Sequence, residues 1–143
     1  DQVMNFLIPK IETVFEKDCI ILIAEHQQKI IAFGILNFEP KYNLYKTLEI
    51  PEIQDVNVQL DFRQQGIATK IIESFENLAR DQECVHIGIS VGLTKDFGPA
   101  QRLYCKLGYM PDGNGITVDR KNVFPDQMVC VNDDLCLMLL KEL

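Results

Sequence analysis

The feature that most constrains the fold is a glycine at position 66, between a stretch typical of a strand and one typical of a helix. Residues 53–58 alternate and carry β-branched side chains, as half-buried strands do. Apolar residues then recur at helical spacing from Ile67 to Ala79. A helix that begins directly after a strand presents unpaired N–H groups and the positive end of its dipole. Because Gly66 lacks a Cβ, residues 63–68 are a candidate anion-binding loop.

Two familiar phosphate loops do not fit this stretch. A Walker A loop needs a second glycine followed by Lys and then Ser or Thr, and a dinucleotide-binding fingerprint needs three glycines at wider spacing. What remains is Arg, two residues, Gly, one residue and Ala. An ordinary strand–turn–helix junction with an incidental arginine is the alternative at this point, because short motifs often occur by chance.

Length, charge and cysteine content restrict the class of protein. The 143 residues suffice for one domain, treated as residues 1–143, although the natural chain can extend upstream of Asp1. A net charge of −7 without a basic stripe argues against nucleic-acid binding. Five cysteines without C-x-x-C spacing and only two histidines argue against a metal site. Most of the cysteines lie in or beside apolar runs, so these are expected to be small core residues. Without a signal peptide or a long apolar span, we expect a cytoplasmic protein that does not enter a membrane.

Hydrophobic periodicity predicts the elements of the first half of the chain. Apolar residues three and four apart predict a helix from Gln2 to Lys17, interrupted or kinked at Pro9. Residues 19–25 and 30–38 are expected to form an antiparallel hairpin around a polar turn. Residues 40–51 are too irregular to be assigned anything but a loop.

The second half of the chain contains a strand–helix–strand unit. Residues 84–91 are expected to form a buried strand parallel to the one before Gly66, with a right-handed crossover between them. Pro99 opens a second helix that ends at Gly108. Turn residues follow at 111–115, and the final apolar runs, 129–131 and 135–140, are expected to form a closing hairpin.

The second helix carries a further block, Gly-Pro-Ala-Gln-Arg-Leu-Tyr-Cys-Lys-Leu-Gly-Tyr, at residues 98–109. It resembles A-x-x-L-Y-x-K-x-G-[FY], the second signature of the GNAT superfamily of N-acetyltransferases. Residues 63–68 resemble that family's acetyl-CoA pyrophosphate loop, and the two blocks have the expected order and spacing. The resemblance covers roughly the whole chain, with the family's usual first strand and helix missing or upstream. One departure is Phe97, where many members carry Asn.

The resemblance implies an α/β (α+β) fold, in which a mixed, mostly antiparallel twisted sheet is flanked by helices and a splayed strand pair binds acetyl-CoA. It also implies that the Val58 N–H polarises the thioester carbonyl, whereas core packing is the other interpretation of Val58 and Leu60. The implied acetyl-CoA contacts are Val56, Asn57, Val58, Leu60, Arg63, Gln64, Gln65, Gly66, Ile67, Ala68, Thr69, Lys70, Ala100, Leu103 and Tyr104.

Tyr104 is the best candidate for a catalytic side chain. It matches the family's tyrosine that protonates the departing CoA thiolate, and a core aromatic with a satisfied hydroxyl is the alternative. No cysteine occupies a matched catalytic position, so a covalent acyl-enzyme is not expected.

The general base stays open at this stage. Glu52 lies where some histone-acetylating relatives keep a glutamate, Asp55 is its rival on the same strand, and His86 and a water chain are weaker options. An unbroken strand would point Glu52 to the face of Val58, and a bulge near Asn57 would reverse Glu52 and Asp55 relative to the cofactor.

The implied function is transfer of acetyl from acetyl-CoA, as co-substrate, to the primary amine of a small molecule or peptide by direct attack in a ternary complex. The alternatives are a non-catalytic acyl-CoA-binding sensor or partner module, and an unrelated phosphate-binding domain. The acidic composition favours cationic acceptors, although net charge is a poor guide to one pocket. A homodimer through the final hairpin or its edge strand is expected from family habit.

Overall fold

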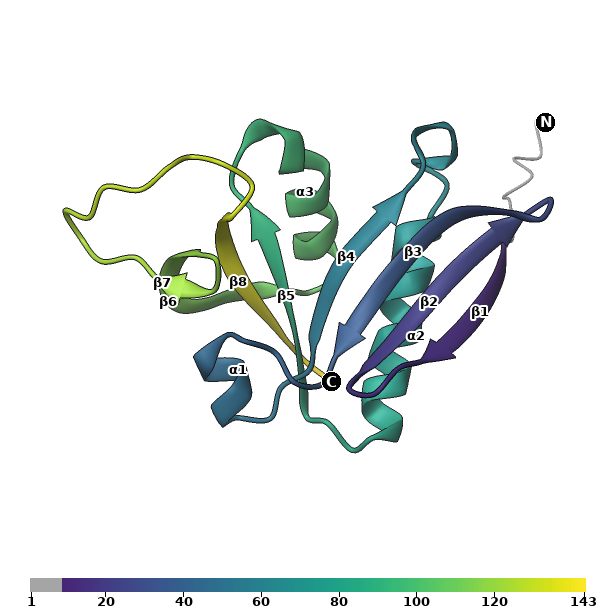
Figure 1. The fold of residues 1–143 in the computed structure, drawn as a ribbon, viewed down its shortest axis with the longest axis horizontal. Coiled ribbons are helices and arrows are strands. Elements are labelled where there is room, and N and C mark those ends of the chain that lie inside the picture. Colours follow the sequence, from purple (N-terminus) through teal and green to yellow (C-terminus); the bar gives the residue numbers. More distant parts are fainter. Residues whose placement is uncertain (1–8) are drawn as a thin grey trace.

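One sheet of eight strands runs through the computed structural model, which describes residues 9–143 (Figure 1). The strand order is β1-β2-β3-β4-β5-β8-β6-β7, and only the β4–β5 pair is parallel. The strands are β1 (Lys10–Phe15), β2 (Cys19–His26), β3 (Lys29–Asn37), β4 (Glu52–Val58), β5 (His86–Gly92), β6 (Met110–Val118), β7 (Lys121–Asn122) and β8 (Leu135–Glu142). The expected mixed, mostly antiparallel sheet flanked by helices is confirmed.

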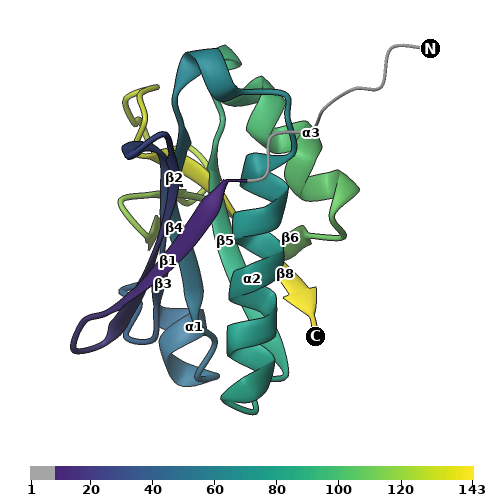
Figure 2. The ribbon, with the colours of Figure 1, turned by 90° about the vertical axis from the view of Figure 1, so that its right-hand side faces the viewer.

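The helices cover different faces of this sheet. They are α1 (Asn43–Thr47), α2 (Ile67–Asp81), α3 (Gly98–Lys106) and the 3-10 turns η1 (Leu60–Phe62) and η2 (Lys95–Phe97). Figure 2 shows α2 and α3 on the same side of the strands. Ile87 and Ile89 pack into the core with α2, whereas Gly88 between them contacts the Tyr45 ring of α1. Because neighbouring side chains of a strand point to opposite faces, α1 covers the other face.

The packing of α2 on the sheet explains one glycine in β3. The buried side of α2 consists of Ile67, Ile71, Ile72, Phe75, Glu76 and Ala79. A Cβ at Gly34 would lie 2.9 Å from the Phe75 ring, so only glycine lets the helix approach this closely. The helix therefore lies flat on the sheet, and its first turn is held beside the end of β4.

Two predictions for the first half of the chain require correction. The helix expected from Gln2 to Lys17 is wrong at residues 10–15, which form edge strand β1 against β2; residues 2–8 of that prediction lie outside the described residues. A short apolar run fits both the roughly 3.6-residue period of a helix and the two-residue period of a strand. At residues 10–15, hydrogen bonding to the β2–β3 hairpin determines that the chain forms a strand. The stretch expected to be a loop contains α1, which is anchored because Tyr42 and Tyr45 are buried against Met138. The hairpin of β2 and β3 is confirmed.

The second half also departs from expectation. The closing hairpin is wrong, because residues 129–131 form no strand and β8 pairs with β5 and β6 instead. The turn expected at 111–115 lies inside β6, where the register against β8 shifts between Pro111 and Ile116. Gly113 and Gly115 both adopt positive φ, as residues of a turn do. In this chain they form a bulge within a strand rather than a turn between two strands.

The cysteines are only partly in the core, contrary to expectation. Cys136 is buried and Cys19 and Cys84 are half-buried, but Cys105 and Cys130 are exposed. Cys105 lies on the outer side of α3, and Cys130 lies in the segment between β7 and β8. None of the helices in residues 9–143 has both the length and the apolar content needed to cross a bilayer.

A buried polar network ties α2 to the far half of the sheet, and it supports a prediction about stability. The Tyr109 hydroxyl donates to Glu76 at 2.9 Å, and the Lys141 ammonium lies 2.9 Å from the same carboxylate oxygen. Tyr109→Phe is expected to lower the free energy of unfolding by about 1.5–3 kcal/mol, since it removes a bond to a charged group. Urea unfolding measures the change.

Tyr104→Phe is the matched control, because in the part of the chain described here the Tyr104 hydroxyl makes no hydrogen bond. Its unfolding free energy is expected to change by less than about 0.5 kcal/mol. Equal losses of unfolding free energy in the two variants would show that the Tyr109–Glu76 hydrogen bond adds no stability of its own.

Candidate active site

The site begins where β4 and β5 separate. These parallel strands pair only at Glu52 with Gly88 and at Ile53 with Ile89, although β4 continues to Val58 and β5 to Gly92. The end of β4 therefore has a partner on the β3 side only. The splayed strand pair expected from the sequence is present, and it opens a gap in the middle of the sheet.

The main chain of Val58 points into this gap. The neighbouring Gln59 N–H donates to the Ile31 carbonyl at 2.8 Å, so it is directed toward β3. Successive backbone groups of a strand alternate in direction, so the N–H and C=O of Val58 are directed toward the β5 side. The Val58 side chain is 9% exposed and belongs to the core. The Val58 side chain therefore packs in the core, while its main-chain N–H is directed toward the gap.

The loop after β4 places the start of α2 beside the gap. Gly66 is the N-cap residue with φ of +80°, and no side chain of residues 9–143 caps the helix. The first helical bond runs from the Lys70 N–H to the Gly66 carbonyl, so the N–H groups of residues 67–69 have no partner within the helix. A Cβ at Gly66 would meet no atom of the described residues within 4 Å, so the surroundings of this helix start are open there.

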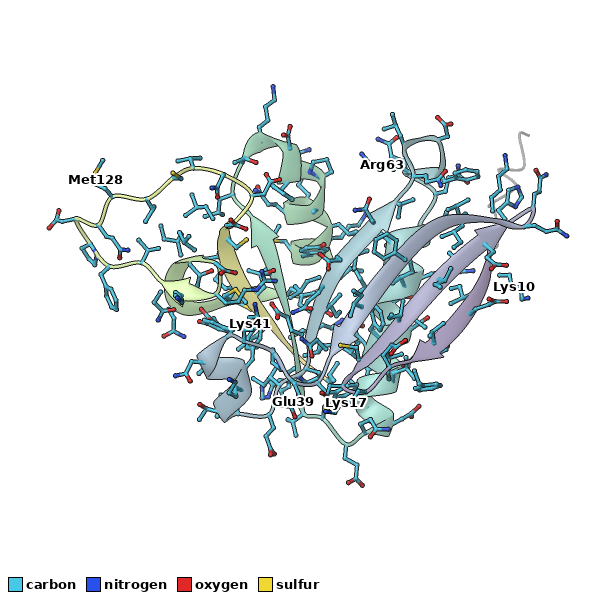
Figure 3. The ribbon with its side chains drawn as sticks, viewed as in Figure 1. Lys10, Lys17, Glu39, Lys41, Arg63 and Met128 are labelled. Carbon is cyan, nitrogen blue, oxygen red and sulfur yellow. The ribbon has the colours of Figure 1, made fainter. Side chains whose placement is uncertain are left out.

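Charged and polar side chains surround this helix start. The Arg63 Nε donates to the Val58 carbonyl at 2.9 Å, which joins the loop to the edge of the gap. Figure 3 shows Arg63 at the end of β4 where the loop begins. Lys70 is exposed in the first turn of α2, and Leu60 is 75% exposed in η1. An anion at the helix start would thus have both N–H donors and cationic side chains nearby.

Helix α3 brings Tyr104 to the same side of the sheet. Tyr104 is 8% exposed and shares one hydrophobic cluster with Val58 and Ile67, while Ala100 and Leu103 pack partly buried against it. Burial raises the pKa of the Tyr104 hydroxyl, which keeps the group protonated at neutral pH. A buried phenol without a hydrogen-bond partner among residues 9–143 is suited to donate a proton to a group entering the gap.

Phe97, where the family often has Asn, has a packing role. A Cβ at Gly92 would lie 2.4 Å from the Phe97 ring, so the ring covers the end of β5. The Gly92 carbonyl accepts a hydrogen bond from Gln101 at 2.8 Å. Buried Thr94 Oγ1, in the same connection, has no partner in the described part of the chain. Position 97 thus supplies apolar packing on β5 in place of the polar contact expected of Asn.

A bulge in β4 decides where the candidate bases point. Phe33 pairs with Asn57 and Ile35 with Gln54, so Asp55 and Val56 together oppose the single residue Gly34. Asp55 adopts φ of +53° at this point. Glu52 consequently lies on the face opposite Val58, and the expectation based on an unbroken strand is wrong. The alternative expectation, that a bulge in this strand turns Glu52 away from the face of Val58, describes the structure, and the bulge lies at residues 55–56.

Glu52 is fully buried but well supplied with partners. Its carboxylate accepts a hydrogen bond from Gln54 Nε2 at 2.6 Å and forms an ion pair with Arg120 at 3.3 Å. Burial raises the pKa of Glu52, and the Arg120 charge only partly offsets this effect. A carboxylate whose pKa is shifted toward neutrality is a better proton acceptor than an exposed one.

The other candidate bases differ in position. Asp55 is exposed and lines a cavity of about 230 Å³ together with Gln54 and Arg120. His86 begins β5 and pairs with Glu142, at the end of β5 far from the splay. Glu52 and Asp55 thus lie near one another on the face opposite α2, and His86 does not join them.

Arg120 is a site residue that the sequence analysis missed. Asp119 and Arg120 form the two-residue turn between β6 and β7, and both have positive φ. Two-residue hairpin turns of this kind usually carry Asn-Gly or Asp-Gly. Here the sequence offers only the aspartate, followed by an arginine, and this is too weak a signal to predict the turn. The Arg120 guanidinium also lies 3.3 Å from the Ser90 hydroxyl of β5, and therefore bridges the two strands that separate.

Comparison with known proteins defines the class of this fold and site. Residues 4–109 match the acetyltransferase (GNAT) family, so the chain belongs to the GNAT acetyltransferase family and is an acyltransferase by class. A search of curated proteins finds no match.

Solved structures share the fold at low sequence identity. A GNAT family acetyltransferase from Elizabethkingia anophelis with acetyl-CoA bound is 19% identical, with a TM-score of 0.64 over 88% of this chain and 77% of that one. An IAA acetyltransferase from Bacillus cereus is 16% identical, with a TM-score of 0.64 over 88% and 79%. A PaiA N-acetyltransferase from Thermoplasma acidophilum in complex with coenzyme A is 13% identical, with a TM-score of 0.61 over 88% and 62%.

The open space at Gly66 supports a prediction about cofactor binding. Gly66→Val is expected to weaken acetyl-CoA binding by about tenfold or more, because the side chain would occupy the space in front of the helix N–H groups. A β-branched residue at this φ also costs about 1–2 kcal/mol of stability. Titration calorimetry with acetyl-CoA, and with ATP as a competing anion, measures the effect.

Gly115→Val is the matched control, since Gly115 has the same φ of +80° and equally open surroundings. It carries the same strain but is expected to keep its acetyl-CoA affinity. Unchanged affinity in the Gly66 variant would place the phosphate-binding loop elsewhere.

Proposed function

We propose that this protein transfers the acetyl group of acetyl-CoA to a primary amine by direct attack within a ternary complex. The observation that carries the proposal is the unpaired end of β4, where the Val58 N–H faces a gap beside the uncapped start of α2. This combination offers a strand edge for an amide-bearing arm and a helix start for phosphates. Two structural neighbours hold acetyl-CoA or coenzyme A, which supports the choice of co-substrate.

The geometry of the gap supports a proposed set of binding residues. The N–H groups of residues 67–69 would hold the pyrophosphate, with Arg63 and Lys70 as nearby cations. The pantetheine arm would extend the sheet along Val56–Val58, in place of the missing pairing with β5. Ala100 and Leu103 would pack against its apolar parts from α3.

The chemical step needs three functions from the protein. The amine nitrogen attacks the thioester carbonyl carbon, and the Val58 N–H stabilises the oxyanion that forms. The carbon–sulfur bond then breaks, and the Tyr104 hydroxyl donates its proton to the leaving thiolate. The proton lost by the amine passes to Glu52, through one water because Glu52 is buried behind Gln54 and Arg120. The products are an N-acetyl amine and free CoA thiol.

A non-catalytic acyl-CoA sensor is the competing function. Both functions predict acetyl-CoA binding, but only a transferase releases thiol in proportion to an added amine. We expect a panel of alkyl amines, amino acids and peptides with free N-termini to contain acceptors that raise thiol release above the rate without amine. Tight acetyl-CoA binding with no amine-dependent release across the panel would favour the sensor.

A further inference from the structure

A cavity of about 720 Å³ lies on the face of the sheet opposite α2. Its wall is formed by the segment 41–47 around α1 on one side and by residues 114–124 of β6, β7 and the following segment on the other. Figure 1 shows α1 and β7 next to one another at this side of the sheet. Tyr42, Leu44 and Phe124 supply apolar surface to the wall.

The charge of this cavity opposes that of the whole protein. Lys41, Arg120 and Lys121 line it, and no acidic side chain of the described residues does. Arg120 is paired with Glu52, but neither lysine forms an ion pair within residues 9–143. Asp112 accepts a hydrogen bond from the Tyr42 hydroxyl but does not line the cavity. In a chain of net charge −7, two unpaired lysines facing one cavity give a local positive potential.

This cavity adjoins a smaller one that lies beside the proposed catalytic carboxylates. Lys41 and Arg120 also line the smaller cavity, which contains Asp55 and Asp119 and so carries both signs of charge. Arg120 in turn contacts Glu52. Figure 3 shows Lys41 near α1, far along the sheet from Arg63 in the loop before α2. The larger cavity, called the lysine cavity below, is therefore distinct from that loop. An acceptor placed here would have its amine near the carboxylates and its other end between the lysines.

We infer that the acceptor is a primary amine that also carries an anionic group, a carboxylate or a phosphate, held by Lys41 and Lys121. This inference rests on the proposed function and names its substrate class. The ammonium end enters the smaller cavity, where Asp55 and Asp119 attract it and Glu52 receives its proton. The anionic end lies in the larger cavity, where the asparagines at positions 43, 114 and 122 offer further hydrogen-bond donors. This inference differs from the expectation of cationic acceptors that the overall composition favours.

The test compares amines in matched pairs that differ only in the anion. The carboxylate arm pairs β-alanine with propylamine and glutamate with its diamide, and the phosphate arm pairs phosphoethanolamine with ethanolamine. Spermidine represents purely cationic acceptors. We expect kcat/KM to be at least about tenfold higher for the anionic member of one arm, as two charge contacts at short range can provide. The preference should shrink as ionic strength rises.

Lysine variants connect the preference to this cavity. Lys41→Gln with Lys121→Gln is expected to bring the anionic-to-neutral ratio of kcat/KM close to one. Lys46→Gln, in helix α1 beside the cavity but outside its lining, is the control and should leave the ratio unchanged. Binding of N-acetylated anionic products in the presence of CoA gives a second measurement that does not depend on turnover.

The outcomes separate this inference from the proposed function. Acetylation of neutral or cationic amines in preference to anionic ones overturns the inference and leaves the transferase function standing. An anionic preference that survives removal of both lysines also overturns it. If no amine in any arm raises thiol release, the proposed function fails and the inference fails with it.

Discussion

Replacing Glu52 with alanine is expected to lower turnover at neutral pH by about a hundredfold to ten-thousandfold, the range typical for loss of a general base. The amine acceptor is mostly protonated at neutral pH, because alkyl amines titrate near 10.4. Glu52 is a buried carboxylate next to the two cavities on the face opposite α2, and burial raises its pKa above the usual value. Its ionised form is the one that accepts a proton, so the wild-type rate should rise with pH as Glu52 loses its own proton.

The pH–rate profile distinguishes Glu52 from its neighbour. Glu52→Ala should recover partly at alkaline pH, when the amine deprotonates unaided, and Glu52→Gln should behave alike while preserving the volume of the side chain. Asp55→Ala is the control, since Asp55 is exposed at the bulge and is expected to contribute less. If Asp55→Ala alone shows the alkaline recovery, the two roles are exchanged; if neither variant does, solvent water accepts the proton.

Tyr104→Phe is expected to reduce turnover by about tenfold to a thousandfold while acetyl-CoA affinity stays nearly unchanged. The hydroxyl is the only part removed, and it has no hydrogen-bond partner in the described residues whose loss would disturb the fold. Its raised pKa keeps it protonated, so the wild-type enzyme has a proton available for the leaving thiolate. Single-turnover rates with a good acceptor and calorimetric titration with acetyl-CoA separate the two quantities.

Tyr109→Phe is expected to have the opposite effects on stability and turnover. Tyr109 is buried on the same side of the sheet, but its hydroxyl is bonded to Glu76. Its variant should lose stability and keep most of its turnover, whereas the Tyr104 variant should keep stability and lose turnover. Full activity in a well-folded Tyr104 variant would make Tyr104 a core aromatic residue and nothing more.

The elements around Gly66 were predictable from the sequence because local signals agree there. Alternation before the glycine, helical periodicity after it and the second signature near Tyr104 each point to the same strand–loop–helix unit. The helix expected at residues 2–17 failed where Ile11 and Val14 fit a helical stripe, although the chain there pairs with β2. In that short stretch, tertiary pairing overrides the local pattern.

The acceptor side of the site depends on contacts that local patterns cannot predict. Arg120 reaches Glu52 across 68 positions of the chain, and the strand order β4-β5-β8-β6 brings them together. The bulge at Asp55 is likewise set by the register of β4 against β3. The lysine cavity combines segments near residues 41 and 121, so its positive charge is invisible in a composition of net charge −7.

A single-turnover experiment with isotopically labelled acetyl-CoA and excess enzyme tests direct transfer most directly. Mass spectrometry follows the label in the intact protein and in the small molecules, with and without an anionic amine acceptor. We expect the label to appear in the N-acetyl amine at the rate of thiol release, with none bound covalently to the protein when the amine is omitted. Label on the protein before amine addition, or thiol release without labelled amine, would contradict direct transfer from acetyl-CoA to the acceptor.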